Sequence, residues 1–320
     1  MKQKLAVAPF APLSEERLAK LREVAKDFEI VICNDRSDAE IADCEIVFGY
    51  PDAKVLGTSK KLKWLHTQTA GVDAFLGSEA NLGTDVILTN SVGAYGLSIA
   101  EHLIMVTLMI LRRMGEYGRL QVASEWKSLG TTETLYGKLV TIVGLGDIGH
   151  NFATRCHSMG AKVRGVVRTP RAEMPEGVDE LFIGGDELDK ALHGADIVAL
   201  CLPSTSETTQ LFDRERLGKL KKGAIILNVG RGTAIDQDAL IELLQSGHLG
   251  GAGLDVTTPE PLPADSLLWA MPNVIITPHV SNGVSLDITL DLIFDKFTEY
   301  LQDYIAGKPF KKVVDRSAGY

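Results

Sequence analysis

The 320-residue chain has few cysteines, a deficit of positive charge and no long apolar run. Its four cysteines are scattered and form no Cys-x-x-Cys pair, which argues against a disulfide framework and favours a reducing cytoplasm. Lysine and arginine number 33 against 42 acidic residues, a net charge of −9. Nucleic acid would meet a repulsive field, so we expect no nucleic-acid partner.

The apolar runs are also too short for a membrane protein. The longest largely apolar run, Leu103–Leu111, ends at two arginines and is much shorter than the roughly 20 residues of a spanning helix. Near the N-terminus, Lys2 and Lys4 precede only a short apolar stretch, which fits no signal-peptide core of about 7–15 residues. We therefore expect neither a membrane partner nor secretion.

Apolar runs typical of β-strands alternate with amphipathic helical runs, the pattern of parallel sheets with crossover helices. A first series of predicted elements covers residues 5–9, 15–26, 30–33, 45–48, 62–67 and 86–90. A second series, with strands apolar enough to be buried on both faces, covers residues 139–143, 151–159, 162–167, 195–202, 224–229, 250–256 and 274–277. Together with the chain length, the two series favour two α/β domains.

Two long helices are predicted around the second series. A proline-free apolar pattern from Leu97 to about Gln121 predicts one helix that bridges the two domains. A stripe that includes Ile288, Leu292 and Phe297 predicts a last helix over residues 286–306. Because this helix follows the final strand, we expect the chain to return to the first domain.

A GxGxxG motif follows the apolar strand 139–143 and opens a helix. In such a turn Gly144 allows the tight bend, Gly146 allows backbone to approach a pyrophosphate, and Gly149 allows the helix to pack close to the strand. The N–H groups of the helix N-terminus then bind the anion. We predict a dinucleotide site here; its contacts are Gly144, Gly146, Asp147, Ile148 and Gly149. The Asp147 carboxylate is unfavourable near phosphates unless it points outward.

The second half of this fingerprint departs from the NAD form. NAD-binding domains place an acidic residue about 20 positions on, to bind the ribose 2′-hydroxyl. From Gly160 to Ala172 this chain has no acidic residue, but it has Arg164, Arg168, Thr169 and Arg171. Cations and donors suit a 2′-phosphate, so we predict that Arg168, Thr169 and Arg171 bind NADP. NAD stays possible.

Three polar residues follow successive apolar strands of the second series. Arg231 follows strand 224–229, Glu260 follows strand 250–256, and His279 follows strand 274–277. In open α/β sheets these carboxyl ends face the ligand crevice, so we predict that Arg231, Glu260 and His279 form a catalytic set, called the polar trio below.

The polar trio fits the reduction of a 2-oxo acid. The planar fork of Arg231 can bind the carboxylate and polarise the ketone. The imidazole of His279 can donate a proton to the nascent alkoxide. Glu260 would hydrogen-bond the other imidazole nitrogen and favour the charged form.

The chain resembles the D-isomer-specific 2-hydroxyacid dehydrogenase family, which includes glyoxylate/hydroxypyruvate reductases. Matching segments run over most of the chain: 69–73, 90–93, 98–102, 144–149, 202–208, 228–232, 254–261 and 277–279. The resemblance implies a substrate domain of residues 1–98 and 287–320 and an NAD(P)-binding Rossmann domain of residues 99–286 inserted between them. It implies an α/β chain whose two domains each contain a parallel sheet of the flavodoxin-like or Rossmann-like type. It also implies a cytoplasmic NAD(P)-dependent oxidoreductase, usually a homodimer.

The resemblance also implies residue roles. Arg231, Glu260 and His279 would be catalytic, with Arg231 and His279 touching substrate. Backbone N–H groups of Ala70, Gly71 and Val72 would bind the substrate carboxylate. Further cofactor contacts would be Leu202, Pro203, Thr208, Val229, Gly230 and Asp255. Thr208 could equally be a helix cap.

Two other functions are also compatible with the sequence. One is a dehydrogenase of 3-phosphoglycerate, for which Lys60, Lys61 and Lys63 would supply cations. The other is a corepressor-like protein that senses the dinucleotide and binds partner peptides. His66, His102 and His157 lack metal-ligand spacing and have only packing roles in this interpretation, so we expect no metal.

Overall fold

The computed structural model describes residues 2–8, 13–283 and 286–319. It divides into two compact units, Met1–Tyr95 with Gly283–Tyr320 (unit 1) and Gly96–Asn282 (unit 2). The domain boundaries expected from the sequence were 98/99 and 286/287, against 95/96 and 282/283 for the two units. No helix in the described part of the chain is long and apolar enough to cross a membrane.

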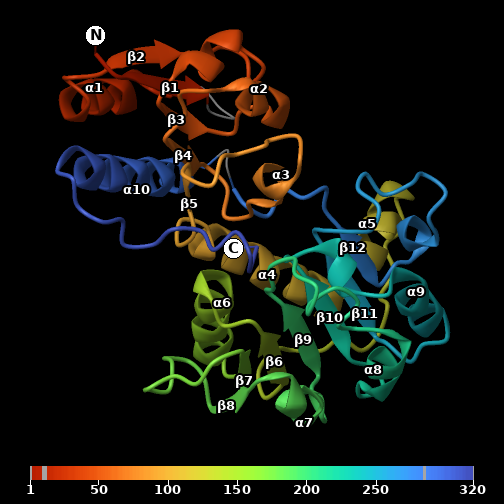
Figure 1. Cartoon of the computed structure of the whole chain (residues 1–320). Coiled ribbons are helices and arrows are strands. Elements are labelled where there is room, and N and C mark those ends of the chain that lie inside the picture. The colour runs from red at the N-terminus through yellow and green to blue at the C-terminus, as the bar shows by residue number, and fades with distance from the viewer. Residues whose placement is uncertain (1, 9–12, 284–285, 320) are drawn as a thin grey trace. The chain divides into compact units, whose positions relative to one another are not determined.

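Unit 1 contains one parallel sheet, in the order β2-β1-β3-β4-β5, which is the flavodoxin-like order (Figure 1). Its elements are β1 (Lys4–Ala8), α1 (Glu15–Val24), β2 (Glu29–Ile32), β3 (Ile46–Gly49), α2 (Ala53–Thr58), β4 (Trp64–Thr67), α3 (Asp73–Leu76), β5 (Ile87–Asn90) and α10 (Asp287–Ile305). The last residue of the predicted first strand, Pro9, lies outside the described residues.

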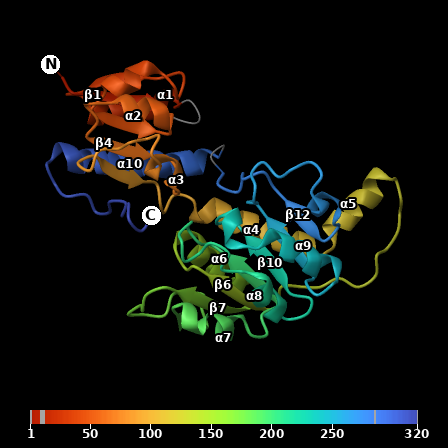
Figure 2. The same cartoon turned by 45° about the vertical axis from the view of Figure 1, so that its right-hand side comes forward.

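Helix α10 belongs to the core of unit 1 although it comes from the far end of the chain. Its Phe297 ring stacks on Phe48 of β3, with ring centroids 4.1 Å apart. On α1, the Arg17 guanidinium forms an ion pair with Asp291 of α10 at 2.8 Å. Figures 1 and 2 both show α10 beside β4. The N-terminal segment therefore completes its core only with residues from the C-terminal end.

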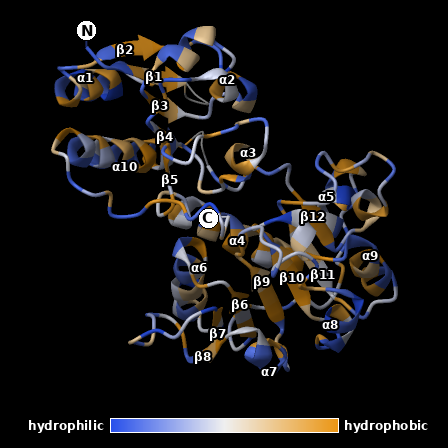
Figure 3. Ribbon diagram, viewed as in Figure 1, coloured by the Kyte–Doolittle hydropathy of each residue, from blue (hydrophilic) through white to orange (hydrophobic). Residues whose placement is uncertain are grey.

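Unit 2 contains a seven-stranded parallel sheet in the order β12-β11-β10-β9-β6-β7-β8. Its elements are α4 (Gly96–Leu111), α5 (Met114–Val122), β6 (Leu139–Val143), α6 (Asp147–Ser158), β7 (Lys162–Val167), β8 (Glu180–Ile183), α7 (Leu188–Leu192), β9 (Ile197–Leu200), α8 (Arg214–Lys219), β10 (Ile225–Asn228), α9 (Gln237–Gln245), β11 (Gly251–Leu254) and β12 (Val274–Ile276). The central strands are strongly hydrophobic (Figure 3). The predicted fold class, two α/β sheets of parallel strands, is confirmed.

The structure corrects two details of the predicted elements. The single helix expected from Leu97 to Gln121 is two helices, because Arg113 adopts a left-handed conformation (φ +57°) between α4 and α5. The Arg113 guanidinium holds this break through two hydrogen bonds to Glu116, at 2.7 and 2.6 Å. Strand β8 was not predicted, although Leu181, Phe182 and Ile183 are apolar; it is the edge strand of the sheet, and its residues are partly or fully exposed.

A buried histidine is held by a complete hydrogen-bond network inside unit 1. His66 of β4 lies 2.7 Å from Thr89 Oγ1 through Nδ1 and 3.3 Å from Ser91 Oγ through Nε2. Ser91 Oγ donates its proton to Thr67 O at 3.0 Å, so it accepts from Nε2–H of His66. Burial, helped by the positive charge of Lys296, lowers the pKa of His66 to about 3. His66 is therefore neutral in the folded chain.

The neutral state of His66 makes stability depend on pH. Between pH 6.5 and about 3 the unfolded chain binds a proton at His66 and the folded chain does not, so this contribution to stability is lost as pH falls through that window. We expect the free energy of unfolding of the parent to fall faster from pH 6.5 to 5 than that of His66→Gln, by up to about 1.4 kcal/mol per pH unit. Urea unfolding followed by circular dichroism measures this.

The matched control is His157→Gln, which replaces an exposed histidine. Its free energy of unfolding should follow the pH dependence of the parent. Parallel curves for the parent and His66→Gln would show that His66 is not the group that titrates.

Candidate active site

The order of strands in unit 2 reverses between β6 and β9, which is where open α/β sheets bind their ligands. The glycine turn lies at this point. Gly144 has a φ of +96°, and a Cβ there would lie 2.6 Å from Cys201 O. A Cβ on Gly149 would lie 2.0 Å from Gly144 O, whereas one on Gly146 would meet no described atom within 4 Å. The turn is thus closed toward the protein and open at Gly146, as a pyrophosphate requires.

The Asp147 side chain is directed away from the phosphate position. Its Oδ2 accepts the Gly96 N–H at 2.7 Å, and its Oδ1 accepts from Asn151 Nδ2 at 3.2 Å. Gly96 is the first residue of α4, so the carboxylate lies against the positive end of that helix. This leaves the first N–H groups of α6, including those of Asp147 and Ile148, for an anion.

The three arginines in and after β7 do not form one cluster. Arg164 lies within β7, where its guanidinium bonds Glu180 Oε2 at 3.2 Å and His193 O at 2.8 Å. Because it is held inside the strand by these neighbours, Arg164 does not join Arg168 and Arg171 at the strand end. Arg168 and Thr169 are exposed directly after β7. Arg171 donates to Leu145 O in the glycine turn.

The loops after β9 and β10 lie in contact beside this turn. A Cβ on Gly230 would lie 2.5 Å from Leu202 O, so the residues predicted at the two strand ends, including Pro203 and Val229, form one edge. Thr208 is in a turn rather than a helix cap: its Oγ1 donates to Pro203 O at 2.7 Å. The hydroxyl of Thr208 thus shapes the loop.

The polar trio follows three neighbouring strands, β10, β11 and β12. His279 Nδ1 lies 2.9 Å from Glu260 Oε2, while Glu260 Oε1 accepts the Thr257 N–H at 3.1 Å. Asn228 fixes the Arg231 backbone, because its amide donates to Arg231 O at 2.9 Å. The Glu260 contact assigns the Nδ1 proton of His279 and leaves Nε2 for a substrate oxygen.

Asp255 is almost completely buried and faces the loop after β12. Its Oδ1 accepts from Thr277 Oγ1 at 2.6 Å and from the Val280 N–H at 2.9 Å, and both carboxylate oxygens accept the Ser281 N–H, at 3.2 and 3.1 Å. The carboxylate of Asp255, predicted as a nicotinamide contact, thus holds the loop that carries His279. This second task of Asp255 could not be inferred from its position in the sequence.

The predicted carboxylate-binding loop lies in unit 1, between β4 and α3. Ala70 O accepts from Asn90 Nδ2 at 2.8 Å, and Gly71 O accepts from Thr69 Oγ1 at 2.5 Å. Within the described parts of the chain, no acceptor binds the N–H groups of Ala70, Gly71 or Val72. The loop thus holds its carbonyl groups in place and leaves three donors for an anion.

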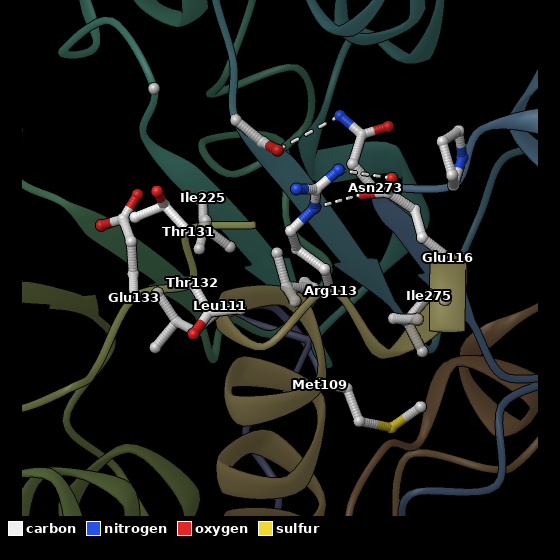
Figure 4. A pocket seen from close by; sticks show the side chains of 15 residues that line it. Met109, Leu111, Arg113, Glu116, Thr131, Thr132, Glu133, Ile225, Asn273 and Ile275 are labelled. Atoms are coloured by element: carbon white, nitrogen blue, oxygen red, sulfur yellow. Dashed lines mark hydrogen bonds and ion pairs between the residues drawn. The ribbon is translucent and has the colours of Figure 1, made fainter. Parts of the chain in front are cut away.

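A pocket of about 220 Å³ lies at the opposite edge of the unit 2 sheet (Figure 4). It is lined at the amino ends of the strands by Ile225, Gly250 and Asn273, and by the ion pair of Arg113 with Glu116. The polar trio follows the carboxyl ends of these strands. This pocket is therefore separate from the candidate active site.

Comparison with known proteins identifies the family. Residues 104–281 match the family model described as the NAD-binding domain of D-isomer specific 2-hydroxyacid dehydrogenases. The chain is 36% identical to glyoxylate/hydroxypyruvate reductase B of Escherichia fergusonii over 236 aligned residues, and the aligned region covers 72% of each chain.

Two solved structures extend the likeness to the whole chain. A D-isomer specific 2-hydroxyacid dehydrogenase family protein from Aeromonas salmonicida is 34% identical, with a TM-score of 0.87 over 99% of this chain and 100% of that one. An NADPH-dependent glyoxylate/hydroxypyruvate reductase from Sinorhizobium meliloti, in complex with NADP and sulfate, is 29% identical, with a TM-score of 0.84 over both whole chains.

The chain belongs to the D-isomer specific 2-hydroxyacid dehydrogenase family. It is an NAD(P)-dependent oxidoreductase that acts on 2-hydroxy acids and the corresponding 2-oxo acids, as the resemblance in its motifs implied.

Proposed function

We propose that this enzyme uses NADPH to reduce small 2-oxo acids, such as glyoxylate and hydroxypyruvate, to the corresponding 2-hydroxy acids, with the D configuration where the product is chiral. The observation that carries the proposal is the 2.9 Å hydrogen bond between Glu260 and His279, at the sheet edge that also carries the glycine turn. The names of the Escherichia fergusonii and Sinorhizobium meliloti relatives support this substrate class.

In the proposed mechanism, the bound dinucleotide supplies the hydride. Arg231 binds the substrate oxygens and polarises the ketone. His279 gives its Nε2 proton to the alkoxide oxygen as the ketone carbon is reduced, while Glu260 keeps the ring oriented through Nδ1. Both His279 and Glu260 are partly exposed, at 45% and 40%, so solvent can return the proton to His279.

We assign substrate carboxylate binding in unit 1 to Ala70, Gly71 and Val72, whose N–H groups have no acceptor among the described residues. A phosphorylated substrate finds less support in unit 1, because Lys61 is ion-paired with Asp43 at 2.8 Å. The predicted cofactor contacts are kept as part of this proposal, and the structure gives Thr208 and Asp255 additional loop-holding tasks.

We expect Arg231→Ala to lower kcat/KM for glyoxylate by at least about 100-fold, because a charged donor to the reacting oxygens is lost. The fall in NADPH absorbance measures the rate with each of four acids: glyoxylate, hydroxypyruvate, pyruvate and 3-phosphohydroxypyruvate. Arg214→Ala removes an exposed arginine that is paired with Glu242 and should keep the parent rate.

Equal kcat/KM for Arg231→Ala and the parent would overturn the role of Arg231. No NADPH or NADH oxidation by the parent with any of the four acids would favour the corepressor-like alternative.

The preference for NADPH follows from the residues after β7. The stretch from Gly160 to Ala172 offers no carboxylate to the ribose, and Arg168 and Thr169 are exposed where β7 ends. Arg171 is held against the glycine turn through Leu145 O, which keeps a second cation at the cofactor edge. The structure of the Sinorhizobium meliloti relative in complex with NADP supports this assignment.

We expect Arg168→Asp to shift the ratio of kcat/KM for NADPH and NADH toward NADH by about tenfold or more, because a charge-assisted contact to the 2′-phosphate becomes a repulsion. Arg22→Asp makes the same change in net charge on the exposed face of α1 and should leave the ratio unchanged. A parent that already prefers NADH would count against the assignment.

We also propose that the enzyme is a homodimer and that it works in the cytoplasm. Its free, scattered cysteines fit a reducing compartment. The segment between α5 and β6 runs as an extended loop from unit 2 (Figure 2). It is tied to the unit at Glu133, whose N–H donates to Leu111 O at 3.0 Å, yet its Trp126 is fully exposed, and Val122 at the end of α5 is 88% exposed. A second copy that covers these side chains would remove a large apolar area from water.

We expect light scattering to give a mass of about twice the 34.6 kDa chain. Trp126→Ser should weaken the dimer about 30-fold or more, as loss of a central aromatic does at interfaces. Met174→Ser removes another exposed apolar side chain and should leave the dimer intact. A parent that is monomeric at all concentrations would exclude the homodimer.

A further inference from the structure

A chain of three side chains lies behind the loop that carries His279. His102 of α4 lies 3.2 Å from Thr277 Oγ1 through its Nε2, and Thr277 Oγ1 lies 2.6 Å from Asp255 Oδ1. All three residues belong to unit 2: His102 lies on α4, Thr277 directly follows β12, and Asp255 directly follows β11. A helix 175 residues away in sequence thus reaches the end of the strand that precedes His279.

The direction of each hydrogen bond in the series His102–Thr277–Asp255 is determined. Asp255 Oδ1 already accepts the N–H groups of Val280 and Ser281, so the Thr277 hydroxyl donates its single proton to Oδ1. The Thr277 oxygen then accepts from Nε2–H of His102. Burial lowers the pKa of His102 and outweighs the opposing charge of Asp255, so the ring is neutral near pH 7 and carries its proton on Nε2.

Asp255, the last member of this hydrogen-bonded series, reaches the backbone of His279. His279 has a φ of +55°, a conformation that is uncommon for residues other than glycine. Its N–H donates to Asp255 O at 2.8 Å, and the next two N–H groups, of Val280 and Ser281, donate to the carboxylate of Asp255. The orientation of the imidazole toward Glu260 therefore depends on where Asp255 is held.

We propose that His102 is a positioning residue for the reaction: through Thr277 and Asp255 it fixes the loop that aims His279 at the substrate. The inference rests on the proposed role of His279 as proton donor. It goes further because it assigns a function to a helix residue that touches no substrate, and because it makes Thr277 the connecting group.

The test compares paired variants that remove or keep each donor. Thr277→Val keeps the shape but loses the hydroxyl, and Thr277→Ser keeps the hydroxyl; His102→Leu loses the ring donor, and His102→Gln keeps an N–H near the Nε2 position. We expect Thr277→Val and His102→Leu to lower kcat with glyoxylate about 10- to 100-fold, because the proton donor is misplaced. Thr277→Ser and His102→Gln should recover most of the rate.

Two further readouts separate positioning from general structural damage. The loss should fall on kcat, and the double variant His102→Leu/Thr277→Val should be no slower than the slower single variant. In the protein labelled with ¹⁵N-histidine and free of ligand, His102 should show the Nε2–H tautomer, and Thr277→Val should move the ring signals of His279.

The matched control is Thr107→Val on α4, the helix that carries His102. The Thr107 hydroxyl is also buried, but it donates to Leu103 O of its own helix. This variant should keep the parent kcat and the parent His279 signals. An active parent together with a fully active Thr277→Val, or with unmoved His279 signals in that variant, overturns the inference. An inactive parent overturns the proposed function instead, and the histidine signals then still decide whether the chain of hydrogen bonds exists.

Discussion

The parallel pairing of strands in unit 2 is the constraint on which the chemistry depends. Because β6, β9, β10, β11 and β12 all run in one direction, their carboxyl ends lie at one edge of the sheet. The glycine turn and the polar trio therefore share this edge although more than 130 residues separate Gly144 from His279. A single reversed strand would carry its polar residue to the opposite edge.

At this edge the side chains that do chemistry are few, and more groups are used to hold them. Asn228 holds the backbone of Arg231, Asp255 holds the loop of His279, and Thr257 orients Glu260 through its N–H. Each holding group is at most 9% exposed, where a hydrogen bond is costly to break. Reactive side chains stay partly open to solvent while their supports are buried.

Much of this arrangement could be predicted from local sequence. The glycine turn follows an apolar strand directly, and Arg231, Glu260 and His279 each follow a strand end, so topology alone brings them to one edge. The contact of His102 with Thr277 could not be predicted, because it depends on how α4 packs on the sheet. The hydrogen bonds that hold Arg164 to Glu180 and His193 could not be predicted either, because they join residues far apart in the sequence.

The break between α4 and α5 was missed for a related reason. The apolar period continues through the break, and only the ion pair of Arg113 with Glu116 and the left-handed backbone at Arg113 show that the helix ends there. Periodicity reports which side chains face the interior, but it does not report an interruption of one or two residues.

The place of α10 in unit 1 has a consequence for the order of folding during synthesis. Unit 2 is continuous in sequence, and its two ends meet where Ser98 Oγ donates to Asn282 O at 3.1 Å, so it can fold once residue 282 has left the ribosome. Unit 1 begins first but lacks Phe297 and its ring stack with Phe48 until the last helix emerges. The N-terminal segment of this protein therefore waits for the rest of the chain, the reverse of the usual order in which N-terminal domains fold first.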